Sequence, residues 1–196
     1  MSFRLEEKLS INQRQINEFI YWIKKNKAEQ IYPPRIVQSI YFENYNNDIY
    51  LDSEEGCVPR KKIRIRNYPE LNNEEYFFEI KISSIEGRFK KTKKINKDFF
   101  NEYLKYGFFD NYYGTCRPKV TVSYLREYYT IWGMRLTIDK NINYQNYSSK
   151  VFKAFDTEVI VELKSDNMFE KEKIQNKFPN QKIRFSKYCR SFKFFN

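Results

Sequence analysis

Basic residues alternate with apolar residues in a short run of the chain, and lysine and arginine are the residue types that bind phosphate. In a strand, successive side chains point to opposite faces, so residues of one parity share a face. Between residues 60 and 66 one parity is apolar at Ile63 and Ile65, and the other is entirely basic (Arg60, Lys62, Arg64 and Arg66). Arginine presents a planar fork of donors that fits phosphate oxygens. The run therefore predicts a strand whose polar face binds a phosphorylated ligand.

The same alternation recurs along the chain, and its polar parity carries more cations than carboxylates. The further cations are Arg4, Lys8, Lys81, Arg126, Arg135, Lys164 and Arg184, and the carboxylates are Glu6, Glu79, Asp139 and Glu162. The whole chain has a formal net charge of +11. A sheet face that is solvated and balanced by cross-strand ion pairs is the alternative interpretation. The surplus of cations instead favours a face that is neutralised by a polyanion.

Period-two runs predict the strands that would position these residues. They cover residues 3–9, 36–42, 60–67, 75–83, 120–128, 134–139, 159–164 and 182–185. Helices are predicted over 16–23 after a capping box of Ser10 and Gln13, over 97–106 between Asn96 and Gly107, and over 169–178. The segments 43–59 and 141–150 read as loops. We therefore expect one mainly β (α+β) domain over residues 1–196, with an eight-stranded antiparallel tunnel or barrel, a basic lumen and helices packed outside.

The composition excludes several classes of active site. The chain has no histidine, which removes histidine triads, histidine-ligated zinc and an imidazole general base. Its five glycines form neither GxGxxG nor GxxxxGK, so phosphate must be bound by side chains. The three cysteines have no metal-like spacing and indicate a reducing compartment. Without a signal-peptide pattern or a long apolar run, a cytoplasmic location is expected.

The carboxylates of the polar parity offer oxygen ligands for a divalent cation. Phosphate chains usually travel with Mg²⁺ or Mn²⁺, and both ions prefer oxygen ligands. Glu162 and Glu6 are the expected metal ligands, whereas Glu79 and Asp139 are better explained by charge balance among the cations.

Several motifs occur together in an order that resembles a known family. They include Arg4-x-Glu6-x-Lys8, Arg64-Ile65-Arg66-x-Tyr68, Glu79-x-Lys81, Tyr124-x-Arg126, Arg135-x-Thr137-x-Asp139, Glu162-x-Lys164 and Phe185-Ser186-Lys187-Tyr188. Over residues 3–190 the chain resembles the VTC domain, the polyphosphate polymerase domain of the vacuolar transporter chaperone complex, within the triphosphate tunnel metalloenzyme superfamily. This resemblance implies an eight-stranded tunnel and transfer of the γ-phosphoryl group of ATP to a growing polyphosphate chain, with Mn²⁺ or Mg²⁺ bound.

The resemblance also implies roles for individual residues. The catalytic, phosphate-binding set would be Lys8, Arg64, Arg66, Lys81, Arg126, Arg135 and Lys187, with further substrate contacts from Tyr124, Arg184 and Ser186. Lys62 and Arg4 join the substrate contacts through their parity, and Glu162 would be the principal metal ligand beside Glu6. Lys187 has the wrong parity to share a face with Arg184 unless the strand ends near Ser186. The expected partners are ATP and inorganic polyphosphate. A membrane-bound partner subunit stays open, and no specific nucleic acid is expected.

Two other functions stay open on the sequence. Inorganic triphosphatases with the same fold usually begin with Glu-x-Glu-x-Lys, and Arg4 replaces the first glutamate here, which favours the polymerase. A non-catalytic module that binds polyphosphate or nucleic acid also fits the net charge of +11 and the many aromatic residues. No RNP-type or KH-type pattern supports a nucleic-acid module.

Overall fold

The computed structural model describes residues 5–12, 14–71, 75–149, 153–165, 176 and 183–195. In chain order its elements are β1 (Leu5–Ile11), α1 (Ile16–Lys25), β2 (Glu29–Glu43), α2 (Asp48–Glu55), β3 (Arg60–Asn67), β4 (Tyr76–Ser84), β5 (Gly87–Ile95), α3 (Lys97–Tyr106), β6 (Phe108–Asp110), β7 (Gly114–Ile131), β8 (Met134–Asn146), β9 (Lys153–Phe155), β10 (Val159–Ser165) and α5 (Lys187–Phe195). None of the described helices is long and apolar enough to cross a membrane.

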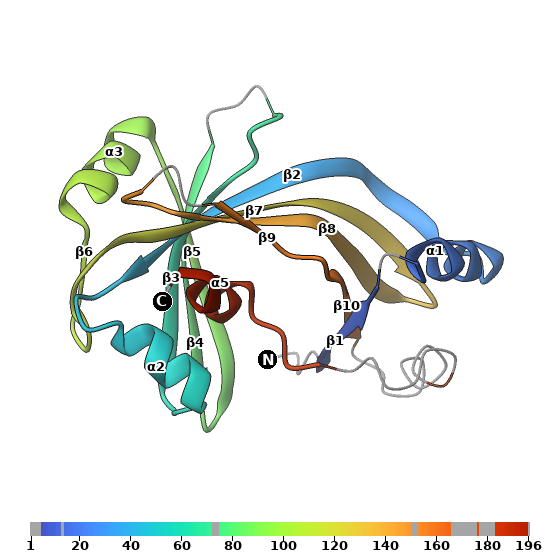
Figure 1. Cartoon of the computed structure of the whole chain (residues 1–196), viewed down its shortest axis with the longest axis horizontal. Coiled ribbons are helices and arrows are strands. Elements are labelled where there is room, and N and C mark those ends of the chain that lie inside the picture. The colour runs from blue at the N-terminus through green and yellow to red at the C-terminus, as the bar shows by residue number, and fades with distance from the viewer. Residues whose placement is uncertain are drawn as a thin grey trace. The chain divides into compact units, whose positions relative to one another are not determined.

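The strands follow one another in a single hydrogen-bonded order, β1-β10-β8-β7-β2-β3-β4-β5, with β6 beside β7 and β9 beside β8 (Figure 1). The pairs β1–β10, β10–β8, β2–β3, β3–β4 and β4–β5 are antiparallel. These findings confirm the expected mainly β class with helices. Among the described strands the order begins at β1 and ends at β5, so the expected closed ring is not formed there.

The chain divides into two compact units. The first contains Met1–Ile36, Tyr124–Ile142 and Phe155–Phe185, and the second contains Val37–Ser123, Asn143–Ala154 and Ser186–Asn196. The long strands β2, β7 and β8 contribute residues to both units.

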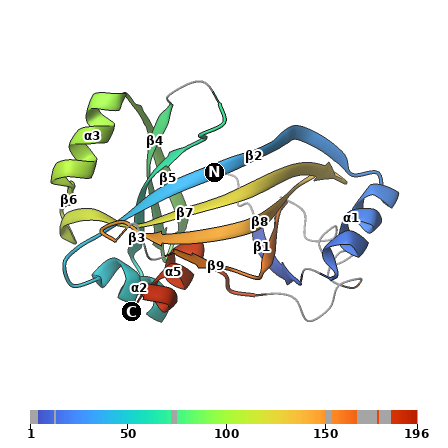
Figure 2. The same ribbon diagram turned by 45° about the horizontal axis from the view of Figure 1, so that its top comes forward.

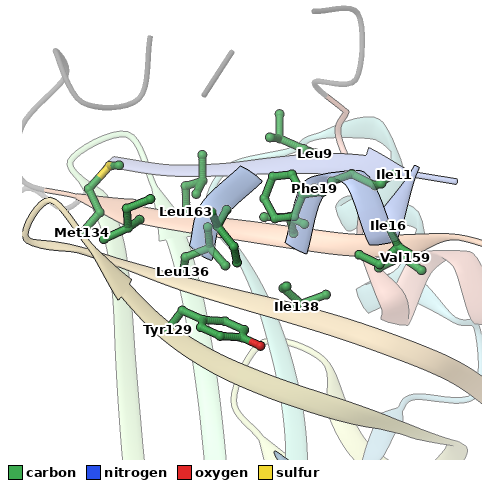
Figure 3. Close-up of a cluster of buried hydrophobic side chains, with 13 residues drawn as sticks. Leu9, Ile11, Ile16, Phe19, Tyr129, Met134, Leu136, Ile138, Val159 and Leu163 are labelled. Carbon is green, nitrogen blue, oxygen red and sulfur yellow. The ribbon is translucent and has the colours of Figure 1, made fainter. Parts of the chain in front are cut away.

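An apolar core in the first unit holds α1 against one face of its strands (Figure 3). Phe19 of α1 is completely buried, as are Ile11 of β1, Leu136 and Ile138 of β8. Trp22 and Trp132 pack against this core with their rings edge to face, 5.9 Å between centroids. Because this face takes the apolar parity of β1, β8 and β10, the polar parity of the same strands lies on the opposite face.

In the second unit, β3 and β4 likewise have an apolar face and a polar face. Ile63 and Ile65 are buried, and Phe78 of β4 packs against Tyr103 of α3, 5.0 Å between ring centroids. On another part of this unit, α2 and α5 lie side by side, with Tyr50 and Phe192 stacked at 4.4 Å (Figure 2). The apolar parity predicted between residues 60 and 66 therefore does form the core.

The boundaries of α3 follow from local sequence, as expected. The Asn96 side chain accepts a hydrogen bond of 2.9 Å from the backbone N–H of Phe99, which caps the first turn. Gly107 ends the helix at φ +88°, where a Cβ would lie 2.4 Å from the carbonyl oxygen of Cys116. Only glycine accommodates both this dihedral angle and this close approach.

Three local expectations are wrong. Ser10 caps no helix: it lies in β1 and donates a hydrogen bond to Glu158, while α1 begins after Gln15. Residues 183–185 form no strand, and helix α5 starts directly after them. The expected loop at 43–59 contains α2, whose N-terminal N–H groups are satisfied by the buried Glu43 carboxylate.

Two further differences concern the strands. Strand β5 was not expected, because its cations occur at both parities and leave no alternation to detect. Strand β8 extends to Asn146, into the segment expected to be a loop. The helix expected over 169–178 lies outside the described residues, apart from Asn176.

Candidate functional site

Strand pairing in the first unit brings several predicted residues to one face. Lys8 of β1 lies directly opposite Glu162 of β10, which in turn lies opposite Thr137 of β8. In the next row Lys164 lies opposite Arg135. Directly opposed residues of an antiparallel pair share a face and approach within side-chain contact. The parity argument therefore correctly grouped these residues, although it could not say which lie opposite one another.

Arg126 of β7 joins this group through two carboxylates. Its Nε and Nη2 atoms donate to the two oxygens of Asp139 at 2.6 and 2.7 Å, and Nη2 lies 3.5 Å from Glu162 Oε2. Its guanidinium also lies 5.1 Å from the ring centroid of Tyr124. Burial lowers the pKa of Arg126, but fully buried Asp139 outweighs this effect and raises it. The expectation that Asp139 balances charge is confirmed.

Lysines border the remaining oxygens of this cluster. Lys164 Nζ lies 3.2 Å from Glu162 Oε1. Lys8 Nζ donates to the carbonyl oxygen of Phe185 at 2.8 Å, and the N–H of Ile183 donates to the carbonyl oxygen of Lys8 at 3.0 Å. These two bonds hold the segment that precedes α5 against β1.

Four predicted residues of the first unit are either exposed or not fully described. Arg135 and Arg184 are exposed to solvent. Arg4 lies outside the described residues, and Glu6 is placed only by its register opposite Lys164.

The second unit carries a second basic face, on β3, β4 and β5. Arg64 donates from Nε to Glu79 Oε2 at 2.6 Å and from Nη1 to the Tyr41 hydroxyl at 2.9 Å, and both ions are at least nine-tenths buried. Lys90 pairs with the other oxygen of Glu79. Burial raises the pKa of Glu79, but Arg64, Arg66 and Lys90 outweigh burial and lower it to about 2. The charge-balancing role expected for Glu79 is confirmed.

Three lysines lie in one row across these strands. Lys62 of β3 is directly opposite Lys81 of β4, which is directly opposite Lys90 of β5. On the three described strands, Glu79 is the single carboxylate of this face. Cations of β3 also lower the pKa of the buried Tyr41 hydroxyl: burial raises it, but Arg64, Arg66 and Lys62 outweigh burial. A row of like charges at this spacing is unfavourable unless an anion neutralises it.

Lys90 is a candidate that sequence reasoning missed. It belongs to β5, which the sequence did not predict as a strand, and its partner across the ladder is Lys81. The one available signal was the density of lysines between residues 90 and 94.

The start of α5 meets the basic face of the second unit. Ser186 Oγ accepts a hydrogen bond from Lys62 Nζ at 2.7 Å and one from the backbone N–H of Cys189 at 3.2 Å, so it caps the helix. Lys187 is the first residue of α5. Its parity mismatch with Arg184 therefore has no meaning, because no strand connects them.

Glu43, which has the same parity on β2 as Tyr41, connects three elements. Its carboxylate accepts hydrogen bonds from the N–H groups of Ile49 and Tyr50 in α2 and from the hydroxyl of Tyr188 in α5. Burial raises the pKa of Glu43 to about 7, and these donors limit the rise. Tyr188 also lies under Lys62, 5.5 Å from Nζ to the ring centroid. Glu43 thus fixes α5, and α5 positions Ser186.

The oxygen ligands of the first unit fit a divalent cation that is shared with a phosphate ligand. The described residues contain no group of three histidine, cysteine or acidic side chains that would enclose a metal ion. Mg²⁺ is commonly held by one or two carboxylates together with substrate phosphates and water. Glu162 offers such a carboxylate, and the buried hydroxyl of Thr137 opposite it has no hydrogen-bond partner among the described residues.

Comparison with known proteins identifies the fold and the family. The chain resembles solved structures of a proposed adenylate cyclase from Bacillus halodurans (TM-score 0.65, 13% identity, 95% of this chain and 96% of that chain) and PH1819 from Pyrococcus horikoshii OT3 (0.59, 18%, 97% and 99%). It also resembles a proposed adenylyl cyclase from Hippeastrum described as having a dominant triphosphatase activity (0.63, 12%, 97% and 96%).

At such identities these likenesses show a common fold. No curated protein matches the chain. The model of the VTC domain matches residues 3–113 and 108–196, which is nearly the whole sequence. The chain therefore has the fold of the triphosphate tunnel proteins and belongs to the VTC domain family.

Proposed function

We propose that this protein is a polyphosphate polymerase, which transfers the γ-phosphoryl group of ATP to the end of an inorganic polyphosphate chain. The observation that carries this proposal is the row Lys62–Lys81–Lys90 beside the Arg64–Glu79 pair, a linear array of cations with a single carboxylate on its face. Such an array suits a linear polyanion. Membership of the VTC domain family and a triphosphate tunnel fold support phosphoryl chemistry in general.

The chemistry asks little of the protein beyond position and charge. A terminal oxygen of polyphosphate attacks the γ-phosphorus of ATP in line, and the bond from that phosphorus to the bridging oxygen of ADP breaks. Transfer of this kind depends on alignment and on neutralising the non-bridging oxygens. Because the attacking oxygen is already ionised, no general base is required, in agreement with a chain that contains no histidine.

The residues that we propose for catalysis and phosphate binding occur in both units. The second unit would contribute Arg64, Arg66 and Lys81, and the first would contribute Lys8, Arg126 and Arg135. The family model supports the assignment because it spans residues of both units. Lys187 completes this proposed catalytic set. Tyr124, Arg184, Ser186, Lys62 and Arg4 are proposed as additional substrate contacts in a single domain over residues 1–196. We place the reaction in the cytoplasm, where ATP is available.

Mn²⁺ or Mg²⁺ is the proposed cofactor, held by Glu162 with Glu6 and by the substrate itself. When bound, the cation would neutralise charge on phosphate oxygens. Arg126 and Lys164 flank the Glu162 carboxylate at 3.5 and 3.2 Å, so they orient it.

Glu162→Gln should reduce metal-dependent turnover by at least about 100-fold, since charge neutralisation by a metal contributes several kcal/mol. Nucleotide binding should be partly retained, because the cations remain. The checks are turnover as a function of Mn²⁺ concentration and Mn²⁺ affinity in the presence of tripolyphosphate. The matched control is Glu127→Gln, which removes a carboxylate paired with Lys140 on the other parity of β7. Full activity of Glu162→Gln at ordinary Mn²⁺ concentrations would exclude this ligand.

The direct test of the proposed function is incubation of the purified protein with ATP and Mn²⁺, followed by gel analysis of chain length and assay of free phosphate. Long polyphosphate chains are the expected product. Free phosphate without chains would identify a triphosphatase, the activity described for the Hippeastrum protein of the same fold. If neither product forms, competition between polyphosphate and a bound oligonucleotide would separate a polyphosphate-binding module from a nucleic-acid module.

A further inference from the structure

Strand β5 is an unusually basic strand at the end of the sheet. Its nine residues, Gly87–Ile95, include five cations (Arg88, Lys90, Lys91, Lys93 and Lys94). Every side chain from Arg88 to Lys94 is exposed, on both faces of the strand. In the described part of the chain β5 pairs with β4 alone, so its outer edge carries no further strand. A ligand could therefore contact β5 from either face and along its edge.

The charges of β5 are only partly neutralised. Lys94 pairs with Glu75 at 2.5 Å, and Lys90 pairs with Glu79. Among the described residues Arg88 and Lys91 pair with no carboxylate, and Lys93 lies 5.5 Å from the ring centroid of Phe99. Lysines on an edge strand also guard against pairing with another chain. That role calls for charge on the edge but gives no reason for the strand to continue the lysine row of the neighbouring strands.

Continuity with the lysine row indicates the kind of ligand. Lys90 lies directly opposite Lys81, so a polyanion that is bound at Lys62 and Lys81 meets β5 next. Arg88 and Lys94 share the face of Lys90, whereas Lys91 and Lys93 point to the other face. A flat anionic membrane would meet only one of these faces. A flexible linear chain can follow the edge and contact both.

We propose that β5, through Arg88, Lys91 and Lys93 beside the lysine row, is a binding track for the distal part of a long inorganic polyphosphate chain. The inference rests on the proposed function, because it takes polyphosphate as the ligand. Additional contacts on β5 act as a second binding site on the same polymer, which raises affinity for long chains without changing affinity for short ones. The protein would therefore retain its product more firmly as the chain grows.

The test compares the affinities of long-chain polyphosphate and tripolyphosphate at several salt concentrations. In the variant Arg88→Gln/Lys91→Gln/Lys93→Gln, affinity for long chains should fall at least about 10-fold and the salt slope should decrease by about 2, since each phosphate contact contributes about 0.7. Affinity for tripolyphosphate should not change. Circular dichroism checks folding, and Arg88→Gln/Lys91→Gln, which keeps the contact of Lys93 with Phe99, should show the same direction of change.

Two control variants separate position from total charge. Arg14→Gln/Lys24→Gln/Lys25→Gln removes the same charge at and before α1 and should bind as wild type does. Arg88→Lys/Lys91→Arg/Lys93→Arg keeps the charge on β5 and should also bind normally. An equal loss of affinity in the α1 control would overturn the proposed track. Wild-type affinity for long chains in the β5 variant would overturn it as well.

Failure of the proposed function gives a different pattern. A wild-type protein that binds neither tripolyphosphate nor long chains would refute the function and the track together. A second pattern would refute the track alone. If the wild-type protein binds tripolyphosphate, and the β5 variant has lost affinity for an oligonucleotide but not for long polyphosphate, the proposed function stands and β5 is assigned to nucleic acid.

Discussion

Lys81→Ala is expected to lower the rate of phosphoryl transfer by at least about 1,000-fold, the loss found when a cation that stabilises a phosphoryl-transfer transition state is removed. Lys81 is the middle lysine of the row on β3, β4 and β5, with Lys62 and Lys90 on either side. Its removal would leave a gap in the array where the phosphates of both substrates are proposed to lie. The fold should be unaffected, because a half-buried lysine in a basic row gives up unfavourable repulsion when it is replaced.

Lys81 is a sharper target than Arg64 on the same face. Arg64 is buried and paired with Glu79, so Arg64→Ala would confound catalysis with stability. The measurements are kcat and KM for chain synthesis from ATP, with the unfolding midpoint as a check on folding. Lys105→Ala, which removes an exposed lysine of α3, is the matched control. A folded Lys81→Ala variant with a rate within about 10-fold of wild type would remove the lysine row from the proposed reaction.

Glu79→Gln is expected to destabilise the protein by about 3–5 kcal/mol, the usual cost of leaving one member of a buried ion pair uncompensated. Glu79 is 3% exposed and neutralises Arg64 and Lys90 together. Glu75→Gln is a matched control, because it breaks an exposed pair with Lys94 just before the same strand. That change should cost no more than about 1 kcal/mol. Denaturant unfolding of both variants measures the difference, and similar costs for the two would contradict the assignment of Glu79 as a buried counterion.

Glu79 should also make the wild-type protein sensitive to acid. Its pKa is about 2 in the folded protein, below the ordinary value of 4.5 for a glutamate side chain. Between these two values the unfolded chain binds the proton and the folded protein does not. The stabilisation is therefore fully present above about pH 4.5 and is lost as the pH falls towards 2, by up to about 3 kcal/mol. Glu79→Gln should lack this part of the pH dependence, and a profile parallel to wild type would count against the low pKa.

The faces of the strands were predictable, whereas their partners were not. The parity of Ile63 and Ile65 against Arg64 and Arg66 places the core and the basic face correctly, because both follow from the period of two along one strand. The pairing of Arg126 with Asp139 and the row of Lys62, Lys81 and Lys90 depend on register. Register is set by packing and turns between segments, which no single strand reveals.

The elements that sequence reasoning missed differ in their physical cause. In β5 both parities are charged, since neither face is buried and no apolar period remains. The residues before α5 read as a strand, although Ser186 caps a helix that follows directly. Helix α2 depends on Glu43, an acceptor from the strand before it, rather than on a strong pattern of its own. Only α2 is decided by a tertiary contact, whereas β5 lacks an apolar period and the start of α5 is set by a local cap.

The Trp22–Trp132 pair gives the molecule an internal spectroscopic reporter. These are the only two tryptophans of the chain, and both lie in the first unit. Intrinsic tryptophan emission during unfolding therefore follows the first unit alone, whereas far-ultraviolet circular dichroism sums the backbone of both. Coincidence of the two melting curves would mean that the strands shared by the units unfold as one cooperative body. Separation of the curves would show that the two units unfold at different temperatures. Both measurements use the unmodified chain without any attached dye.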